Sequence, residues 1–308
     1  MNDQGIIKKF INWTENTKNG KIASKAFKWI FNGLIIYYLL TEILEIGFAE
    51  TLKSLPTNGW FYILFTILYL GLPVSEYFVY SKIWPIEFWD TIVNFVLKKI
   101  YNNSLIGYSG DIYLGLHIAK ITNIEVNKAL SDVKDVAILS SISSTIFAIF
   151  ILVVFLFIGK VPEHIINRSY LAYAIGVFII IMFIVLMLPK KFRSVLFSLN
   201  GKQSIYIITV NNFRLLLLSI IQILQWKSVL PNVELTVWIS YIALQIITTR
   251  IPLIPNRDLI FLAMGFELAK VLDISLASLT AMLIINNLLD KIINLATFLV
   301  IKLKNSKK

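Results

Sequence analysis

Charged side chains interrupt the apolar segments of this chain at a few positions, and these positions could bind a charged ligand. The stretch TTRIPLIPNRDLIFLAMGFELAKVLDI lies between long apolar runs, and four of its charged residues are candidates: Arg250, Arg257, Asp258 and Lys270. Arg214 stands inside another apolar run, 205–226. A guanidinium group can hold a phosphate through two parallel hydrogen bonds, and an arginine at membrane depth costs roughly 2.5–3.5 kcal/mol on insertion scales. We therefore expect these residues to contact an anionic headgroup. For Arg214, an ion pair with an acid on another helix is an equal alternative.

A second polar stretch, NSLIGYSGD, contributes Asn103 and Asp111. Like the first stretch, which holds Pro252 and Pro255, it contains residues that interrupt helices. Asn or Asp at the start of the next helix can cap free N–H groups, and irregular backbone at membrane depth occurs only where it is buried in protein or lines a wet cavity. Each stretch is therefore predicted to be a break that feeds a short helix and binds a polar ligand, with Asp111 and Asp258 organising the two breaks. Ordinary loops between spans are the alternative interpretation.

Other chemistries find little support in the composition. The chain has no cysteine, and its two histidines, His117 and His164, lie far apart, so we expect no disulfide, no thiolate chemistry and no metal site. The acidic residues between 102 and 132 lack the spacing of a metal-dependent transferase, and no glycine-rich phosphate-binding loop is present in the sequence. We expect no catalytic residue and no cofactor.

The elements that must position these residues are apolar segments of about 20 residues, the length that matches the hydrocarbon thickness of a bilayer. Of the 308 residues, 57% are hydrophobic and only 15% are charged, and the mean hydropathy is +0.75. Soluble domains carry about 25% charged residues. The sequence therefore predicts an all-α, polytopic helical membrane protein. Seven candidate spans are clear: 29–48, 60–80, 136–159, 169–188, 205–226, 235–249 and 276–301.

The net charge of +11 arises mainly from basic residues at the two ends and in the loops. Because cytoplasmic segments are enriched in Lys and Arg, residues 1–27 and 303–308 are predicted to be basic cytoplasmic segments that flank a single transmembrane domain, 28–302. Both ends on one side require an even number of crossings. Letting 86–104 cross gives about eight transmembrane helices, although the basic loop 190–202 then falls outside. Without a soluble domain, we expect no nucleic-acid partner.

Two segments in different halves of the chain are similar to each other, which indicates an internal repeat. WDTIVNFVLKKIYNNSLIGYSGDIYLGLHIAKITNI covers 89–124, and WISYIALQIITTRIPLIPNRDLIFLAMGFELAKVLDI covers 238–274. Both run from a tryptophan through an apolar stretch and a break to an Ala-Lys pair, and a long apolar segment follows each. Interrupted segments in matching places of two halves are typical of a transporter-like binding site. We therefore expect two related halves, around 86–159 and 235–302, each with a broken or re-entrant segment.

At these two motifs the chain resembles the flippase-like integral membrane region of the lysylphosphatidylglycerol synthase family. NSLIGYSGD is similar to that region's Asn-x-Leu followed by a Gly-Asp or Gly-Glu turn. RIPLIPNRDLIFLAMGFELA, followed by AMLIINNLLDKIINL, is similar to its later turn and final long helix. The resemblance covers most of the chain, roughly residues 28–302, and departs from the family at 256–258, where glycines and a nearby Glu are usual. It implies an inner-membrane protein that handles polar lipids and, in some members, flips aminoacylated phosphatidylglycerol. The family's soluble synthase domain does not follow Ile301, so no aminoacyl transfer is expected.

The expected function is therefore to bind a polar or anionic lipid and to translocate it across the membrane. The expected headgroup contacts are Arg214, Arg250, Arg257, Asp258, Lys270, Asn103 and Asp111. The alternative is a membrane-embedded transferase, or an accessory subunit, in envelope glycolipid or lipid biosynthesis, and an association with such an enzyme would then be expected. A transporter of small solutes or ions is a third interpretation.

Overall fold

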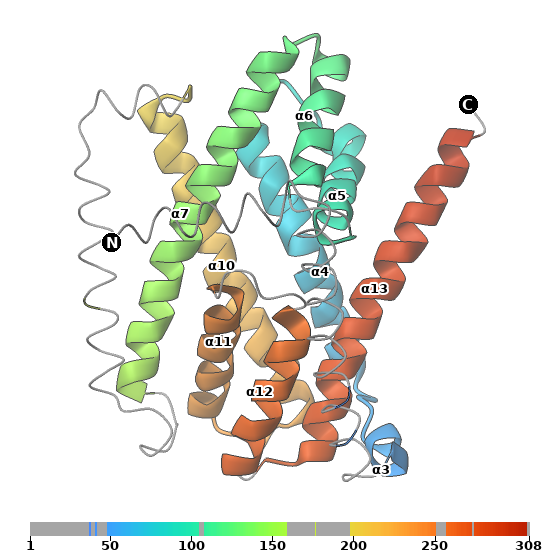
Figure 1. The fold of residues 1–308 in the computed structure, drawn as a ribbon, viewed down its shortest axis with the longest axis vertical. Coiled ribbons are helices and arrows are strands. Elements are labelled where there is room, and N and C mark those ends of the chain that lie inside the picture. The colour runs from blue at the N-terminus through green and yellow to red at the C-terminus, as the bar shows by residue number, and fades with distance from the viewer. Residues whose placement is uncertain are drawn as a thin grey trace, which may run out of the picture. The chain divides into compact units, whose positions relative to one another are not determined.

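All regular structure in the described residues is helical (Figure 1). The computed structural model describes residues 48–104, 108–158, 198–250, 257–272 and 274–306, together with the single positions 37, 41 and 176. The helices in this part of the chain are α3 (Phe48–Lys53), α4 (Gly59–Tyr80), α5 (Phe88–Ser104), α6 (Ser109–Thr122), α7 (Val126–Ile158), α10 (Gly201–Val229), α11 (Leu235–Arg250), α12 (Arg257–Val271) and α13 (Leu276–Ser306). The expected all-α class is confirmed over these residues.

Four of these helices are long and apolar enough to cross a membrane: α4, α7, α10 and residues 276–301 of α13. They coincide with four of the predicted spans. The predicted span 235–249 forms an apolar helix that is shorter than these four. The predicted spans 29–48 and 169–188 lie outside the described residues except at positions 37, 41, 48 and 176.

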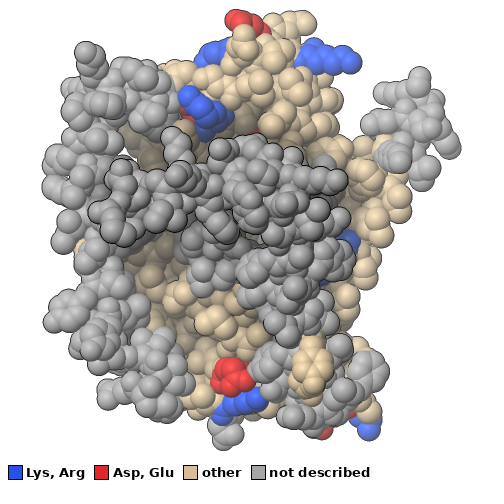
Figure 2. Space-filling view, viewed as in Figure 1, with Lys and Arg blue, Asp and Glu red and all other residues tan. Residues whose placement is uncertain are grey.

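The outward surfaces of the long helices are apolar. Ile67 on α4, Phe213 on α10 and Leu295 on α13 are all exposed. Most of the described surface that Figure 2 shows is also uncharged. Large exposed apolar surfaces mark regions that meet lipid or another protein. These features agree with a multi-pass helical membrane protein.

The chain forms two compact units. The smaller comprises residues 1–55 and 244–283, and the larger comprises residues 56–243 and 284–308. Within the smaller unit, α12 buries Phe266 and Ala269, and the start of α13 buries Leu279. The larger unit contains α4, α5, α6, α7 and α10 with most of α13, and it contains the buried charged side chains.

Helices α4 and α10 of the larger unit lie side by side and antiparallel along their whole length. At one end Asn58 Nδ2 donates to the Ser228 carbonyl over 3.3 Å. At the other end Gln203 Nε2 donates to the Lys82 carbonyl, also over 3.3 Å. Helix α4 therefore ends where α10 begins.

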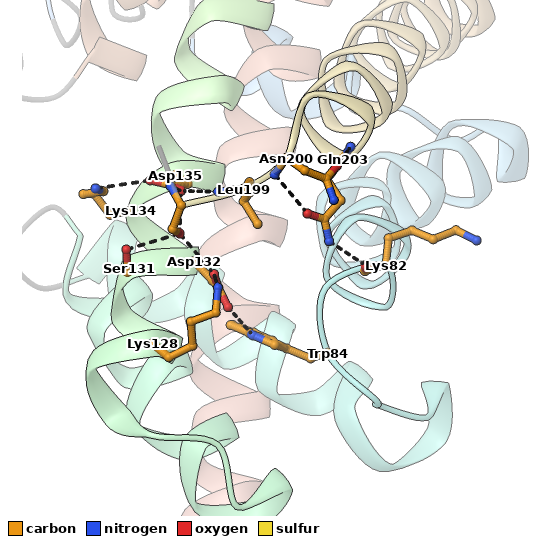
Figure 3. A network of polar contacts seen from close by, with 11 residues as sticks. Lys82, Trp84, Lys128, Ser131, Asp132, Lys134, Asp135, Leu199, Asn200 and Gln203 are labelled. Carbon is orange, nitrogen blue, oxygen red and sulfur yellow. Dashed lines mark hydrogen bonds and ion pairs between the residues drawn. The ribbon is translucent and has the colours of Figure 1, made fainter. Parts of the chain in front are cut away.

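This shared end is rich in polar contacts (Figure 3). We call it the polar end, and it comprises residues 81–87, 123–135 and 198–203. Trp84 Nε1 donates to Asp132 Oδ2 over 3.1 Å, which joins the end of α4 to the first third of α7. The carboxylate of Asp135 is fully buried and accepts hydrogen bonds from the Ser198 backbone and hydroxyl groups and from the Leu199 N–H, just before α10. Helices α4, α7 and α10 thus meet at one end of the unit.

Helices α5 and α6 form an antiparallel hairpin. The Tyr113 hydroxyl of α6 donates to Asn94 Oδ1 of α5 over 3.1 Å, and the rings of Tyr101 and Tyr113 are 5.0 Å apart. Because α5 starts and α6 ends at the polar end, the chain returns to the end that it left. The crossing expected for 86–104 stays a prediction, and α5, a helix of 17 residues, leads into a returning helix. The expectation of about eight spans depended on that crossing.

The part of α13 in the larger unit runs parallel to α4. Gln225 and Asn286 exchange hydrogen bonds of 2.9 and 3.2 Å, and Gln225 also donates to the Phe61 carbonyl. Further along, the Tyr69 hydroxyl donates to Asn294 Oδ1 over 2.8 Å. The separation from 61 to 69 on α4 equals that from 286 to 294 on α13, so the two helices advance together toward the polar end.

Candidate functional site

An ion cluster around Lys98 of α5 lies buried inside the larger unit. The Lys98 Nζ atom is 2.7 Å from Glu76 Oε1 of α4 and 3.0 Å from Asp111 Oδ1 of α6. The side chains of Lys98, Glu76 and Asp111 are only 6%, 15% and 12% exposed. Charge attraction is stronger in such surroundings than in water, and removing one partner would leave a buried charge uncompensated. The cluster therefore ties three helices together.

Asn102 and Gly110 hold Asp111 in this position. Asn102 Nδ2 donates to Asp111 Oδ2 over 2.8 Å, and Asn102 Oδ1 accepts the Gly110 N–H over 2.8 Å. A Cβ at Gly110 would lie 2.8 Å from the carbonyl carbon of Lys98 and would overlap its oxygen. The missing side chain thus lets α6 approach the backbone of α5. The second glycine of NSLIGYSGD is what brings Asp111 to the cluster.

Arg214 of α10 adds a second cation beside Glu76. Its Nη1 lies 3.4 Å from Ser75 Oγ, and the Glu76 carboxylate attracts it electrostatically. With Lys98 and Asp111, the cluster contains two cations and two carboxylates, and its formal charge is zero. Within the described residues, Arg214 Nε and Glu76 Oε2 are buried without a hydrogen-bond partner. The cluster therefore offers one donor and one acceptor to a water molecule or a ligand.

A groove of about 650 Å³ lies between α6 and α7 and reaches the cluster at Asp111. Its lining includes the polar residues Tyr108, Asp111 and Lys134 and, further along α7, Ile138, Ile142 and Thr145. From Lys134 to Thr145 an α-helix rises roughly 16 Å. Since the long apolar run of α7 begins just after Asp135, the groove extends from the polar end into the apolar zone.

Two of the seven expected headgroup residues, Asp111 and Arg214, belong to this one cluster. Lys270 lies elsewhere, on α12 in the smaller unit, where its Nζ is 3.3 Å from Glu267 of the preceding turn. The side chains of the other four lie outside the described residues: Asn103 at the end of α5, Arg250 at the end of α11, and Arg257 and Asp258 at the start of α12. The short helices expected after the two breaks are confirmed, because α6 has 14 residues and α12 has 15.

Lys98 and Glu76 form the centre of the cluster, yet they were not among the expected site residues. A signal for Lys98 does exist in the sequence, because two adjacent lysines inside an expected span each need a partner. Lys99 finds its partner on α13, where Asp290 Oδ1 is 3.0 Å from its Nζ. Glu76 gives no comparable signal, since a carboxylate near the end of a span is usually solvated.

Comparisons of the chain with models of protein families, with curated proteins and with solved structures find no match. The resemblance at NSLIGYSGD and at the later proline-rich turn therefore stays a prediction. The functional proposal rests on the geometry of the ion cluster and of the groove.

Proposed function

We propose that this protein binds a polar or anionic lipid in the groove between α6 and α7 and moves it across the membrane. The groove itself is the observation that carries the proposal, because it begins beside charged residues and continues along the apolar part of α7. A phospholipid is divided in the same way, with a charged headgroup and apolar chains. The volume of about 650 Å³ is typical of sites for small molecules.

The polar part of the groove suits a headgroup. Lys134 lines it and can approach a phosphate as a point charge. Asp111 lines it as well, but its charge is balanced by Lys98 at 3.0 Å. A headgroup that approaches Asp111 thus meets a neutral polar wall, and it avoids the penalty of facing an unpaired buried charge.

The remaining lining favours a lipid chain over a small hydrophilic solute. Ala137, Ile138 and Ile142 present apolar groups along α7. Polar groups of a solute would lose their hydrogen bonds to water against such a wall, whereas an acyl chain loses nothing there. Ser141 and Thr145 supply small side chains that leave room beside the helix.

Three expectations from the sequence belong to the same proposal. The chain would act as the flippase-like region of the lysylphosphatidylglycerol synthase family does, in the cytoplasmic membrane. Asn103, Arg250, Arg257 and Asp258 would supply further headgroup contacts, because each lies beside one of the two breaks between helices. No transferase chemistry is required of any of them.

Movement of fluorescent anionic and zwitterionic phospholipids between the leaflets of proteoliposomes tests the proposal. Ala137→Phe places an aromatic ring in the groove, and Ile146→Phe, at an exposed position of the same helix, is the matched control. We expect the wild type and Ile146→Phe to move labelled lipid and Ala137→Phe to lose most of the rate while remaining folded. Equal rates for Ala137→Phe and the wild type would show that lipid does not use this groove.

The biosynthetic alternative has a separate outcome in the same experiment. A photoactivatable phospholipid would label α7 beside Ala137 if the groove holds lipid. Translocation would be refuted if the groove is labelled but neither the wild type nor a folded variant moves phospholipid between the leaflets. This result would favour a subunit that presents lipid to an enzyme.

A further inference from the structure

Five helix ends lie together at the polar end of the larger unit. Helix α4 ends there and α5 begins, α6 ends and α7 begins, and α10 begins. The contact of 3.1 Å between Trp84 Nε1 and Asp132 Oδ2 joins the end of α4 to the start of α7. The contact of 3.1 Å between the Leu199 N–H and Asp135 Oδ2 adds the start of α10. The hairpin α5–α6 therefore leaves from and returns to the same end.

The last turns of α5 reach about halfway along α4. Lys99 Nζ, in the last third of α5, donates to the Tyr69 carbonyl over 3.3 Å. Val96 and Ile100 belong to one buried cluster with Tyr69. Tyr69 is at the middle of the 22-residue helix α4, which is long and apolar enough to cross a membrane. A pair of helices that reaches this depth and returns to its own end is re-entrant.

The chain also leaves and rejoins the larger unit near the opposite end. Helix α11 begins shortly after α10 ends, and the rings of Trp226 and Trp238 lie 5.5 Å apart. After α12 the chain enters α13, whose Asn286 accepts a hydrogen bond of 2.9 Å from Gln225 in the last third of α10. The segment between these two contacts, which contains most of α11 and all of α12, therefore starts and finishes beside the end of α10, away from the polar end.

The two pairs occupy matching places in the chain. Helices α5, α6 and α7 have 17, 14 and 33 residues, and helices α11, α12 and α13 have 16, 15 and 31. Helices α4 and α10, which precede the two sets, are antiparallel. The two sets thus have helices of similar lengths in the same order along the chain, but the helices that precede them run in opposite directions. This is the pattern of an inverted repeat.

We propose that the chain crosses the membrane six times and inserts two re-entrant hairpins from opposite faces, α5–α6 from the cytoplasmic face and α11–α12 from the other. The crossings are α4, α7, α10, α13 and the predicted spans 29–48 and 169–188. In transporters with inverted repeats, the interrupted segments of the two halves form the substrate site near the middle of the bilayer. One hairpin then lies in each leaflet of the bilayer. This arrangement does not depend on which substrate the protein carries.

Basic residues assign the polar end to the cytoplasm. In the described part of the chain, five lysines lie at or beside that end: Lys82, Lys120, Lys128, Lys134 and Lys202. With six crossings, the basic segments 1–27, 190–193 and 303–308 fall on the same side, as the excess of Lys and Arg in cytoplasmic loops requires. The conflict at loop 190–202 disappears. One consequence rests on the proposed function: the groove starts at the polar end, so its lipid would come from the cytoplasmic leaflet.

Single cysteines in this naturally cysteine-free chain test the topology. The substitutions are Asn127→Cys and Lys202→Cys at the polar end, and Asn232→Cys and Ser275→Cys at the other, all at exposed positions. A membrane-impermeant maleimide is applied to intact cells and to inside-out vesicles. We expect the first two cysteines to react only from the cytoplasmic face and the last two only from the outer face. The cysteine-free chain is the blank, and reaction of all four proteins in detergent shows that each thiol is reactive.

The competing arrangement gives a different pattern. With eight crossings, the cysteines at 127, 202 and 275 would react from outside and the one at 232 from inside. That pattern, or reaction of any position from both faces, would overturn the proposal. The labelling reports the side of the membrane on which each loop lies and does not measure lipid movement. The proposed topology can therefore be refuted while lipid translocation is confirmed, and lipid translocation can be refuted while the topology is confirmed.

Discussion

Adding one methyl group at Gly110 is a direct test of how α6 meets α5. A Cβ there would lie 2.8 Å from the Lys98 carbonyl carbon, whereas ordinary contact begins at 3.4 Å, and it would overlap the carbonyl oxygen as well. The two helices must therefore separate by more than the 0.6 Å needed at the carbon. The obstacle is backbone, which cannot rotate away as a side chain can.

Separation of the helices disturbs the ion cluster, and the cost can be worked from the contacts. The hydrogen bond of 2.8 Å from the Gly110 N–H to Asn102 would be lost, at about 0.5–1.5 kcal/mol. Overpacking adds about 1–3 kcal/mol, and the better helix propensity of alanine returns up to about 1 kcal/mol. We therefore expect Gly110→Ala to lower the free energy of unfolding by about 0.5–4.5 kcal/mol, with a midpoint of about 2.5 kcal/mol. A complete break of the Asp111–Lys98 pair would raise the loss further.

Reversible unfolding in mixed detergent micelles, followed by tryptophan fluorescence, measures this loss. Gly59→Ala and Gly201→Ala are matched controls, because a Cβ at either position meets nothing within 4 Å. Both are expected to change stability by less than about 1 kcal/mol. If Gly110→Ala were as stable as the two controls, the close approach of α6 to α5, and with it the position of Asp111, would be refuted.

Three further predictions use the same unfolding assay. Gln225→Ala, Asn286→Ala and the double variant should give a coupling energy of about 0.6–1.7 kcal/mol, and additive losses would show that the two amides do not bond within the membrane. Asp135→Ala should cost more than Lys128→Ala, since the first leaves buried donors unmatched, whereas the second removes a half-exposed lysine and leaves the buried Asp132 carboxylate with its hydrogen bond from Trp84; equal losses would contradict the burial of Asp135. Lys98→Met should cost about 3–5 kcal/mol because it strands two buried carboxylates, and a neutral result would mean that water already reaches them.

The positions of the long helices follow from the sequence alone. Apolar runs of about 20 residues can be satisfied only as helices in a bilayer, so the spans 60–80 and 205–226 reappear as α4 and α10 within a few residues. The break in NSLIGYSGD was also predictable, since its polar residues and glycines cannot continue an apolar helix. Arg214 was expected to need a partner or a cavity, and Asp111 was expected to organise its break; both lie in one cluster.

The partners themselves, and the direction of the hairpin, depend on the tertiary structure. Hydropathy measures how apolar a segment is, and it carries no information on whether the segment crosses the membrane or turns back. For that reason 86–104 was expected to cross, although α6 packs antiparallel to α5 and brings the chain back to the end where α5 began. Lys98 meets Glu76 and Asp111 only because two other helices pack against its own, and Gly110 allows α6 to come close enough. Composition and local pattern determined that this is a helical membrane protein with broken segments; packing between helices decided which charges neutralise one another and where the groove lies.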